Sequence, residues 1–323
     1  MICQNLILQN QITRQIGIGR RAPKVVWLSL MGIKMRGNLI LLLTFIGFSC
    51  FGQKKPVIEV YLIGGQSNAT GQGYLSNMDD SMKVDHRVLI YHSGKAHLNS
   101  NFSPNQWFPL HASSESPDRF GPELGFGSQL QNLRPKARIA IIKHAHSGTN
   151  LYEQWNPGKD RKDTLNQGLQ YKVFMSTVKT GLDSLVKHGY QPVIKGMLWQ
   201  QGESDADKGG EISKSYGKNL KQFITRVRQD LKTVNMLFVY GYVYPPPNKS
   251  IAIDEVRTGQ REVASSAKTS LSVRNAYVII TDDLSQRAND KNTHYPKDHI
   301  HFGTNGTWEL GLRMAKEMNK HLK

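Results

Sequence analysis

The chain has 323 residues and carries 42 Lys and Arg against 25 Asp and Glu, a formal net charge of +17. The basic residues are scattered, and no long basic block interleaves with aromatic residues, so the charge does not predict a nucleic-acid-binding protein. Attraction to acidic polysaccharides or to an anionic surface is the milder interpretation of this charge.

Residues 1–52 are predicted to be an N-terminal extension that contains a signal peptide. After Met35, one basic residue precedes an apolar run at 39–48, and small residues follow up to Gly52. The run is too short to cross about 30 Å of hydrocarbon comfortably, so stable membrane insertion is not expected, and a single membrane anchor is the alternative. We expect Met35 to be the true start and the protein to be secreted or periplasmic, with lipid anchoring through Cys50 as the alternative.

The rest of the chain, residues 53–323, is predicted to be one domain without disulfides. Cys3 and Cys50 are the only cysteines, and both lie in the segment that we expect to be removed. A cysteine nucleophile and thiolate metal sites are therefore excluded from the domain. Because residues 1–52 hold six Lys and Arg and no acid, the domain retains 36 basic against 25 acidic side chains. A chain of this length can bury a sufficient core without disulfides.

Short apolar runs alternate with longer amphipathic segments along this domain. Several of the runs are almost entirely apolar, as in strands covered on both faces. The order predicts an α/β fold, a single three-layer α/β/α domain with a mainly parallel sheet. The predicted strands are 57–63, 87–91, 137–145, 192–199, 236–243 and 276–282. The predicted helices are about 122–133, 166–188, 211–233, 253–267 and 304–321, and the predicted loops are 92–120, 146–165 and 244–252.

The first strand is followed by Gly-Gly-Gln-Ser-Asn at residues 64–68. Ligands of open parallel sheets bind beyond the carboxyl ends of the strands, so segments that follow strands are the candidate site. A strand-to-helix turn would expose Ser67, whose hydroxyl becomes a nucleophile once a base takes its proton. The Ser67 N–H can also donate to an oxyanion. Taken alone, the stretch is more typical of an ordinary turn.

The third predicted strand leads into HAHSGTNLYEQW at residues 144–155. Gly148 would let the backbone approach a ligand closely. Tyr152 and Trp155 could line a sugar site. The alternative interpretation is an ordinary loop with a packed tryptophan.

The fourth predicted strand leads into WQQGESDAD at residues 199–207. Gln201 can donate its amide N–H to an oxyanion. Three acids lie close together there, but no histidine flanks them at a ligand spacing. A solvated acidic loop is therefore favoured over a metal site for Glu203, Asp205 and Asp207.

The last predicted helix is preceded by KDHIHFGTNG at residues 297–306. Asp298 and His301 are three residues apart, which places them on one face of a tight turn. The carboxylate can then orient the imidazole and leave its other ring nitrogen free to act as a base. His299 is expected to point elsewhere. Alone, the pair could also be an ordinary surface contact.

Together these segments resemble the SGNH/GDSL hydrolase superfamily, and within it the sialate O-acetylesterase-like group that includes the acetyl xylan esterases of carbohydrate esterase family six. The resemblance extends over residues 57 to about 320 and implies a flavodoxin-like sheet. One departure is that the family often has Gly-Gly-Thr where this chain has Ser147-Gly148-Thr149. The matching segments are IGGQSNATG (63–71), RFGPELGFG (119–127), HSGTNLYEQW (146–155), LWQQGESDA (198–206) and DHIHFGTNG (298–306).

The resemblance also implies the roles of the site residues. Ser67 is expected to be the nucleophile, His301 the general base, and Asp298 the residue that orients it. The resemblance implies neither a metal nor an organic cofactor. The expected oxyanion hole consists of the Ser67 N–H, the Gly148 N–H and the Gln201 side chain, and the expected supporting residues are Gln66, Asn68 and Glu203.

The predicted function is that of a carbohydrate O-acetylesterase, which releases acetate from an acetylated oligo- or polysaccharide through an acetyl-enzyme. Aromatic residues in the predicted open loops, Trp107, Tyr152 and Trp155, favour a sugar, whereas Trp308 is expected in the core. Two alternatives remain at this point: a carbohydrate-binding protein that lost the reaction, and an esterase for lipids or small acyl esters. The sequence names neither the glycan nor the oligomeric state.

Overall fold

The central strand of the main sheet is β1 (Val57–Gly65), which pairs in parallel with β6 on one side and with β7 on the other. This computed structural model describes residues 54–94, 104–244 and 250–322, so the predicted signal peptide lies outside the described residues. The contacts group Pro56–Lys323 into one compact unit. The other strands of this sheet are β3 (Leu89–His92), β4 (Phe108–Pro109), β6 (Ile139–Lys143), β7 (Gln191–Gln200), β8 (Leu237–Gly241) and β9 (Ala276–Ile279).

The strand order is β4-β3-β6-β1-β7-β8-β9, and each neighbouring pair is parallel except β3 with β4. If β1, β6, β7, β8 and β9 are counted as the first to fifth strands, their order is 2-1-3-4-5, which is the flavodoxin-like order. The predicted mainly parallel sheet is confirmed. β3 and β4 extend this sheet at one edge, and β2 (Gly73–Tyr74) forms a separate antiparallel pair with β5 (Arg119–Phe120).

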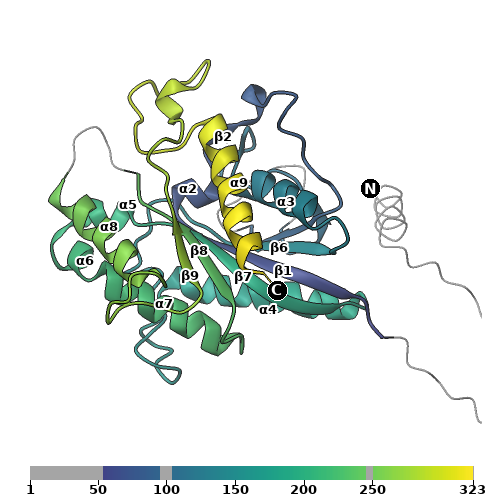
Figure 1. Cartoon of the computed structure of the whole chain (residues 1–323), viewed down its shortest axis with the longest axis horizontal. Coiled ribbons are helices and arrows are strands. Elements are labelled where there is room, and N and C mark those ends of the chain that lie inside the picture. Colours follow the sequence, from purple (N-terminus) through teal and green to yellow (C-terminus); the bar gives the residue numbers. More distant parts are fainter. Residues whose placement is uncertain (1–53, 95–103, 245–249, 323) are drawn as a thin grey trace, which may run out of the picture. The chain divides into compact units, whose positions relative to one another are not determined.

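Helices cover both faces of the sheet. α3 and α9 pack against each other on one face (Figure 1), and their bounds coincide with the predicted helices. α4 contacts β6 and β7, and its Tyr171 ring packs edge to face against Phe223 of α7. The three-layer α/β/α prediction is therefore confirmed. The long helices are α3 (Pro122–Leu133), α4 (Leu169–Lys187), α7 (Tyr216–Asp230), α8 (Ile251–Val263) and α9 (Thr304–His321).

Several element boundaries differ from the sequence-based expectation. The predicted helix at 211–233 is divided at Ser215, whose hydroxyl donates to the Glu211 carbonyl and ends α6 (Gly210–Lys214). α8 begins at Ile251 because Ser250 caps it through a bond from the Ile253 N–H. Residues predicted to be loop form α5 (Glu203–Lys208), and the turn after β1 forms α2 (Ser67–Thr70).

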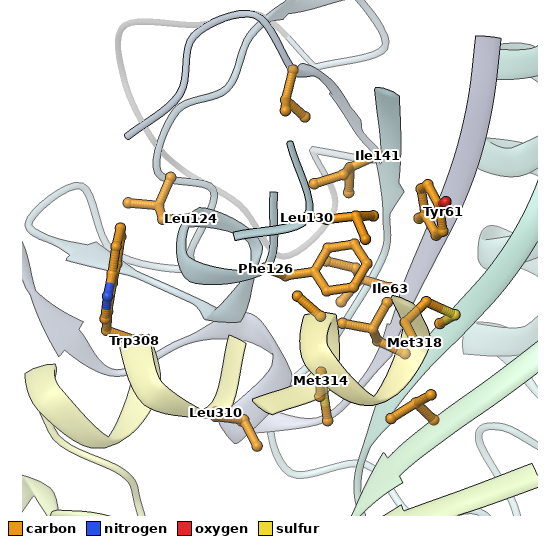
Figure 2. Packing of buried hydrophobic residues seen from close by; sticks show 14 of the residues in the cluster. Tyr61, Ile63, Leu124, Phe126, Leu130, Ile141, Trp308, Leu310, Met314 and Met318 are labelled. Atoms are coloured by element: carbon orange, nitrogen blue, oxygen red, sulfur yellow. The ribbon is translucent and has the colours of Figure 1, made fainter. Parts of the chain in front are cut away.

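The two faces of β1 enter different parts of the core. Tyr61 and Ile63 face α3 and α9, where the Tyr61 and Phe126 rings meet edge to face at 5.6 Å (Figure 2). Met314 and Met318 of α9 complete this cluster, and the predicted burial of Trp308 is confirmed. The opposite face holds aromatic side chains, namely Trp155, Phe174, Trp199, Phe223 and Phe238.

Gly65 ends β1 in a conformation that other residues rarely adopt, with φ at +137°. A Cβ atom at this position would lie 2.1 Å from the Gln200 carbonyl oxygen of β7. A larger residue would therefore separate the ends of the two central strands. The glycine keeps the turn after β1 directly beside the segment that follows β7.

No helix within residues 54–94, 104–244 and 250–322 is long and apolar enough to cross a membrane.

Candidate active site

Ser67 is the first residue of α2, at the carboxyl end of the central strand. Its side chain is nearly buried, with 5% of the residue exposed. The Ser67 Oγ lies 2.9 Å from the Nε2 of His301, although 234 residues separate the two along the chain. The turn therefore presents the hydroxyl to an imidazole from the other end of the sequence.

His301 uses its second ring nitrogen to contact Asp298. The His301 Nδ1 lies 2.8 Å from Oδ2 and 3.0 Å from Oδ1 of this carboxylate. The His301 and Ile300 N–H groups also donate to Oδ1, so the turn wraps around the acid. His299 points away and contacts Gln286 at 2.6 Å, as its place in the turn predicts. Serine, histidine and aspartate thus form one hydrogen-bonded line.

Asp298 is surrounded by groups that favour its ionised form. Burial opposes ionisation, but hydrogen bonds and charge from His301 and the charge of Arg287 outweigh it and hold the pKa of Asp298 well below its usual range. The Arg287 Nε donates to Asp298 Oδ2 at 2.6 Å. Arg287 was not among the predicted site residues, because it lies in no segment that resembles a known motif.

Asn68, a predicted supporting residue, ties the serine turn to the histidine turn. Its Nδ2 donates to Glu203 Oε1 at 2.7 Å and to the Ile300 carbonyl at 3.2 Å. Its Oδ1 accepts from the Phe302 N–H at 3.0 Å. Glu203 Oε2 is buried without a hydrogen-bond partner among the described residues. Burial raises the pKa of Glu203 against the opposing effect of the Asn68 bond.

Gln66 and Gln201 join the turn after β1 to the turn after β7. The Gln66 Oε1 accepts from Gln201 Nε2 and from the Ser204 N–H, both at 3.1 Å. Gln201 is completely buried, and its Nε2 also contacts the Thr149 carbonyl and the Asp205 carboxylate. The two N–H groups of Gln201 therefore already face three protein acceptors. These contacts favour a structural role for the Gln201 side chain, and its donation to an oxyanion stays a prediction.

The three acids after β7 are not one solvated cluster. Asp207 is exposed, whereas Asp205 is completely buried and accepts from the Leu151 and Tyr152 N–H groups. Burial raises the pKa of Asp205 to about 6 against the opposing effect of these bonds. The prediction of a solvated acidic loop is therefore wrong for Asp205, because this carboxylate holds the loop after β6 in place.

Gly148 lies in that loop with φ at +69° and is exposed. A Cβ atom there would meet no atom within 4 Å, so the glycine serves backbone conformation rather than close packing. The preceding Ser147 donates its N–H to Glu115 at 2.8 Å, which holds the loop from outside. Neither the Ser67 N–H nor the Gly148 N–H donates to a backbone acceptor in the described part of the chain.

A buried ion pair supports the end of α2. The Lys143 Nζ lies 2.5 Å from Glu123 Oε2, and both side chains are inaccessible to solvent. The same ammonium donates to the Thr70 carbonyl at 2.9 Å, and the Glu123 carboxylate accepts from the Gly121 N–H. The pair therefore links β6, α2 and the start of α3.

Two tryptophans that were expected in open loops are buried. Trp155 is completely buried, and its Nε1 donates to Thr149 Oγ1 at 2.9 Å. Trp107 is 9% exposed and packs against the Tyr91 ring at 5.1 Å. The expectation that they line a sugar site is wrong, because both rings pack inward against other aromatic rings. Tyr152 is 39% exposed and remains accessible.

A cavity of about 430 Å³ adjoins the residues that contact Asn68. Glu203 and Ile300 form its border with the serine and histidine turns, and Tyr244 and Ile253 contribute apolar surface. Within the described residues, no group of three or more His, Cys, Asp and Glu side chains could hold a metal ion.

The sheet, with a serine, histidine and aspartate in line beyond its carboxyl edge, defines an SGNH-type hydrolase fold. Residues 57–320 match the family described as carbohydrate esterase, sialic acid-specific acetylesterase. The chain belongs to this family. A comparison with curated proteins finds no significant match.

Several solved structures share the fold. A protein from Arabidopsis thaliana is 20% identical, has a TM-score of 0.60, and the match covers 83% of this chain and 100% of that one. A carbohydrate acetylesterase from Xanthomonas citri is 18% identical with a TM-score of 0.54, covering 81% of this chain and 56% of that one. NanS is 15% identical with a TM-score of 0.53, covering 82% and 98%. At these identities the likeness establishes the fold alone.

Proposed function

We propose that this protein is a serine O-acetylesterase that releases acetate from an acetylated oligo- or polysaccharide. The single observation that carries the proposal is the line from Ser67 Oγ to His301 Nε2 at 2.9 Å and from His301 Nδ1 to Asp298 at 2.8 Å. Family membership adds the acetylated carbohydrate as substrate class. The Xanthomonas citri neighbour, described as a carbohydrate acetylesterase, is consistent with this choice.

The proposed reaction proceeds in two halves. The Ser67 Oγ forms a bond to the acetyl carbon while its proton passes to His301 Nε2. The tetrahedral intermediate then breaks the bond to the sugar oxygen, which takes the proton from His301 and leaves as an alcohol. Water next attacks the acetyl-serine, again giving a proton to His301, and the Ser67 Oγ leaves with that proton. Acetate and the free serine are the products.

Backbone N–H groups are the proposed donors to the oxyanion. The Ser67 N–H lies at the start of α2, and the Gly148 N–H lies in an exposed, left-handed turn. Two such donors hold the negative oxygen of the intermediate without reorganising during the reaction. Gln201 is assigned a different role: it holds Gln66 and Asp205, and thereby the positions of both loops.

The cavity beside Glu203 and Ile300 is the proposed place of the sugar. His301 must return its proton to the sugar oxygen, so the leaving group lies on the side of the histidine turn. The cavity adjoins that turn through Ile300. Its apolar wall at Tyr244 and Ile253 suits the C–H face of a sugar ring, and its acidic side chains suit hydroxyl groups.

Export is proposed on the predicted signal peptide within residues 1–52. Mass spectrometry of the N-terminus of the protein recovered outside the cytoplasm would test this part, and a chain that begins at or before Met35 would contradict it.

The function is tested by measuring acetate release from a panel of acetylated polysaccharides and acetylated sialic acid. Wild type is expected to release acetate from at least one member, and Ser67→Ala is expected to release none above background. Ser81→Ala is the matched control, because this serine is exposed and its hydroxyl donates to Asp79 at the surface, outside the candidate site. Acetate release by Ser67→Ala at the wild-type rate would overturn the proposal.

A further inference from the structure

We propose that Arg287 is a positioning residue for the reaction: it orients Asp298 toward His301 and sets the lowest pH at which His301 can act as a base. The inference rests on the proposed function of Ser67, His301 and Asp298. Arg287 belongs to no segment that pointed to the site in the sequence. Its contacts connect the segment that carries Asp298 with the segment that follows Ser67.

The Arg287 side chain is held on three sides. Its Nε donates to Asp298 Oδ2 at 2.6 Å, and its Nη2 contacts the same oxygen. Its Nη1 donates to Gln72 Oε1 at 2.7 Å. The guanidinium lies 3.9 Å from the centre of the Tyr295 ring, and only 8% of the side chain is exposed. A buried, forked donor in this arrangement has little freedom to move.

Arg287 fixes the direction of the Asp298 carboxylate. The Oδ1 atom accepts from the N–H groups of Ile300 and His301, while Oδ2 takes the bond from Arg287. The His301 Nδ1 approaches both oxygens, at 2.8 and 3.0 Å. A carboxylate held from both ends cannot rotate away from the imidazole. The orientation of His301 toward Ser67 therefore depends on Arg287 through Asp298.

Gln72 extends this fixation to the nucleophile side. It follows α2 directly after Gly71, and it is 5% exposed. Its Oε1 accepts from Arg287 Nη1 and from Arg119 Nη1 at 2.5 Å. The segment that carries Ser67 and the segment that carries Asp298 thus share one guanidinium. This shared contact sets how the two segments lie relative to each other.

The charges around His301 define the expected effect on pH. Two titratable residues, Asp298 and His299, lie on the same turn as His301. The short helix η2 (Arg287–Asn289) contributes Arg287, and Asp290 follows it directly. From α5 the Glu203 carboxyl interacts electrostatically with His301. Arg119 stands behind Gln72. Arg287 is the positive charge that contacts Asp298 directly, so it partly neutralises the carboxylate that would otherwise favour a proton on His301.

Removal of the guanidinium is therefore expected to make His301 easier to protonate. The base form of the imidazole would then be lost at a higher pH than in wild type. The activity of the enzyme falls at low pH as His301 is protonated, and this fall is the acidic limb of the pH–rate profile. A residue that only holds the turn together would lower stability or rate without moving the acidic limb. The pH profile separates the two roles.

The test compares Arg287→Gln, Arg287→Lys and a control, Arg134→Gln. Arg134 is a matched control because it forms an equally close pair with Glu59, at 2.6 Å, at the far end of β1 from Ser67. The readout is kcat and kcat/KM for 4-nitrophenyl acetate between about pH 5 and pH 9. Arg287→Gln is expected to lower kcat by about tenfold or more, within the range that a positioned base supplies. Its acidic limb is expected to move to higher pH.

Arg287→Lys keeps the charge but loses the fork, so it is expected to lower kcat while keeping the acidic limb of wild type. An unchanged acidic limb in Arg287→Gln, or an equal shift in Arg134→Gln, would overturn the proposal. Should Arg287→Gln not fold, Arg287→Lys still decides, because a kcat equal to wild type contradicts positioning.

A second readout does not depend on turnover. The imidazole of His301 is titrated by NMR in Ser67→Ala with and without Arg287→Gln, and its midpoint is expected to rise when the arginine is absent. An equal midpoint in both proteins would overturn the inference about charge. Absence of esterase activity in wild type would instead count against the proposed function, so the two failures are distinguishable.

Discussion

The Ser67 Oγ lies 2.9 Å from the His301 Nε2, although 234 residues separate the two along the sequence. The turn after β1 carries the serine at the carboxyl end of the central strand, and the turn before α9 carries the histidine. Asn68 supports this contact by accepting from the Phe302 N–H and donating to the Ile300 carbonyl. The geometry of the pair thus depends on how two distant segments pack.

Replacing His301 with Asn should remove the proposed base while leaving the turn intact. We expect kcat for 4-nitrophenyl acetate to fall by about 10³-fold or more, because the serine hydroxyl is a weak nucleophile without a base. His188→Asn is the control, since His188 lies at the end of α4 and its exposed ring contacts the Ser184 carbonyl. A His301→Asn enzyme with more than about a tenth of wild-type kcat would contradict the proposed mechanism.

Replacing Asn68 with Ala should weaken both the fold and the reaction. The Phe302 N–H and the Glu203 carboxyl would lose a buried partner, and we expect the free energy of unfolding to fall by about 2–3 kcal/mol. We also expect kcat to fall by about tenfold as the histidine turn loosens.

Urea unfolding and steady-state kinetics measure the two effects of Asn68→Ala. Asn219→Ala removes an amide that bonds Ser215 within α7, and it serves as the control. Equal kinetics of Asn68→Ala and wild type would show that the link between the two turns is irrelevant to the reaction.

Replacing Gln201 with Ala should affect stability more than catalysis. The change removes a donor from the Gln66 and Asp205 side chains, so we expect a loss of about 2–3 kcal/mol in the free energy of unfolding. The kcat of the folded variant is expected to fall by less than about tenfold, because the side chain has no N–H left for an oxyanion. A kcat lowered about 10²-fold with unchanged stability would restore Gln201 as an oxyanion donor.

The buried acid Asp205 should give the protein a distinctive dependence of stability on pH. Its folded pKa, about 6, lies above the usual value of 3.8, so its contribution to stability is present below about pH 4. That contribution is lost as the pH rises through about 6, by up to about 3 kcal/mol at roughly 1.4 kcal/mol per pH unit. Asp298 has the opposite sign: its lowered pKa contributes stability above about pH 4, which is lost as the pH falls further.

Comparison with Asp205→Asn isolates the contribution of the Asp205 carboxyl to the free energy of unfolding. The free energy of unfolding of wild type minus that of the variant should decrease between pH 4 and pH 7, as measured by urea unfolding. A difference that stays constant or increases over this range would show that the Leu151 and Tyr152 N–H groups keep Asp205 ionised.

Much of the site was predictable because its reactive residues lie in short segments with recognisable chemistry. Ser67 follows the first apolar strand, and Asp298 and His301 are three residues apart in one turn. The mainly parallel sheet followed from apolar runs that alternate with amphipathic helices. These features depend on local sequence, and the structure reproduces them.

Other features depend on contacts between segments that no local pattern links. Trp155 could have faced a sugar or the core, and it packs among the aromatic rings of α4, α7 and β7. Gln201 could have faced the oxyanion, but Gln66 and Asp205 engage its amide. In each case packing of the protein provides the partners, and Phe174, Phe223 and Gln66 lie in distant segments.

The local chemistry of the chain therefore set which residues could react, since a serine in a tight turn and an aspartate three residues before a histidine are short-range arrangements. The tertiary fold set which polar groups became structural. Arg287, which already contacts Asp298, reaches Gln72 because the packed sheet brings the turn after β1 beside the turn before α9. Burial then decides the outcome, since a polar group removed from water must find a partner within the protein.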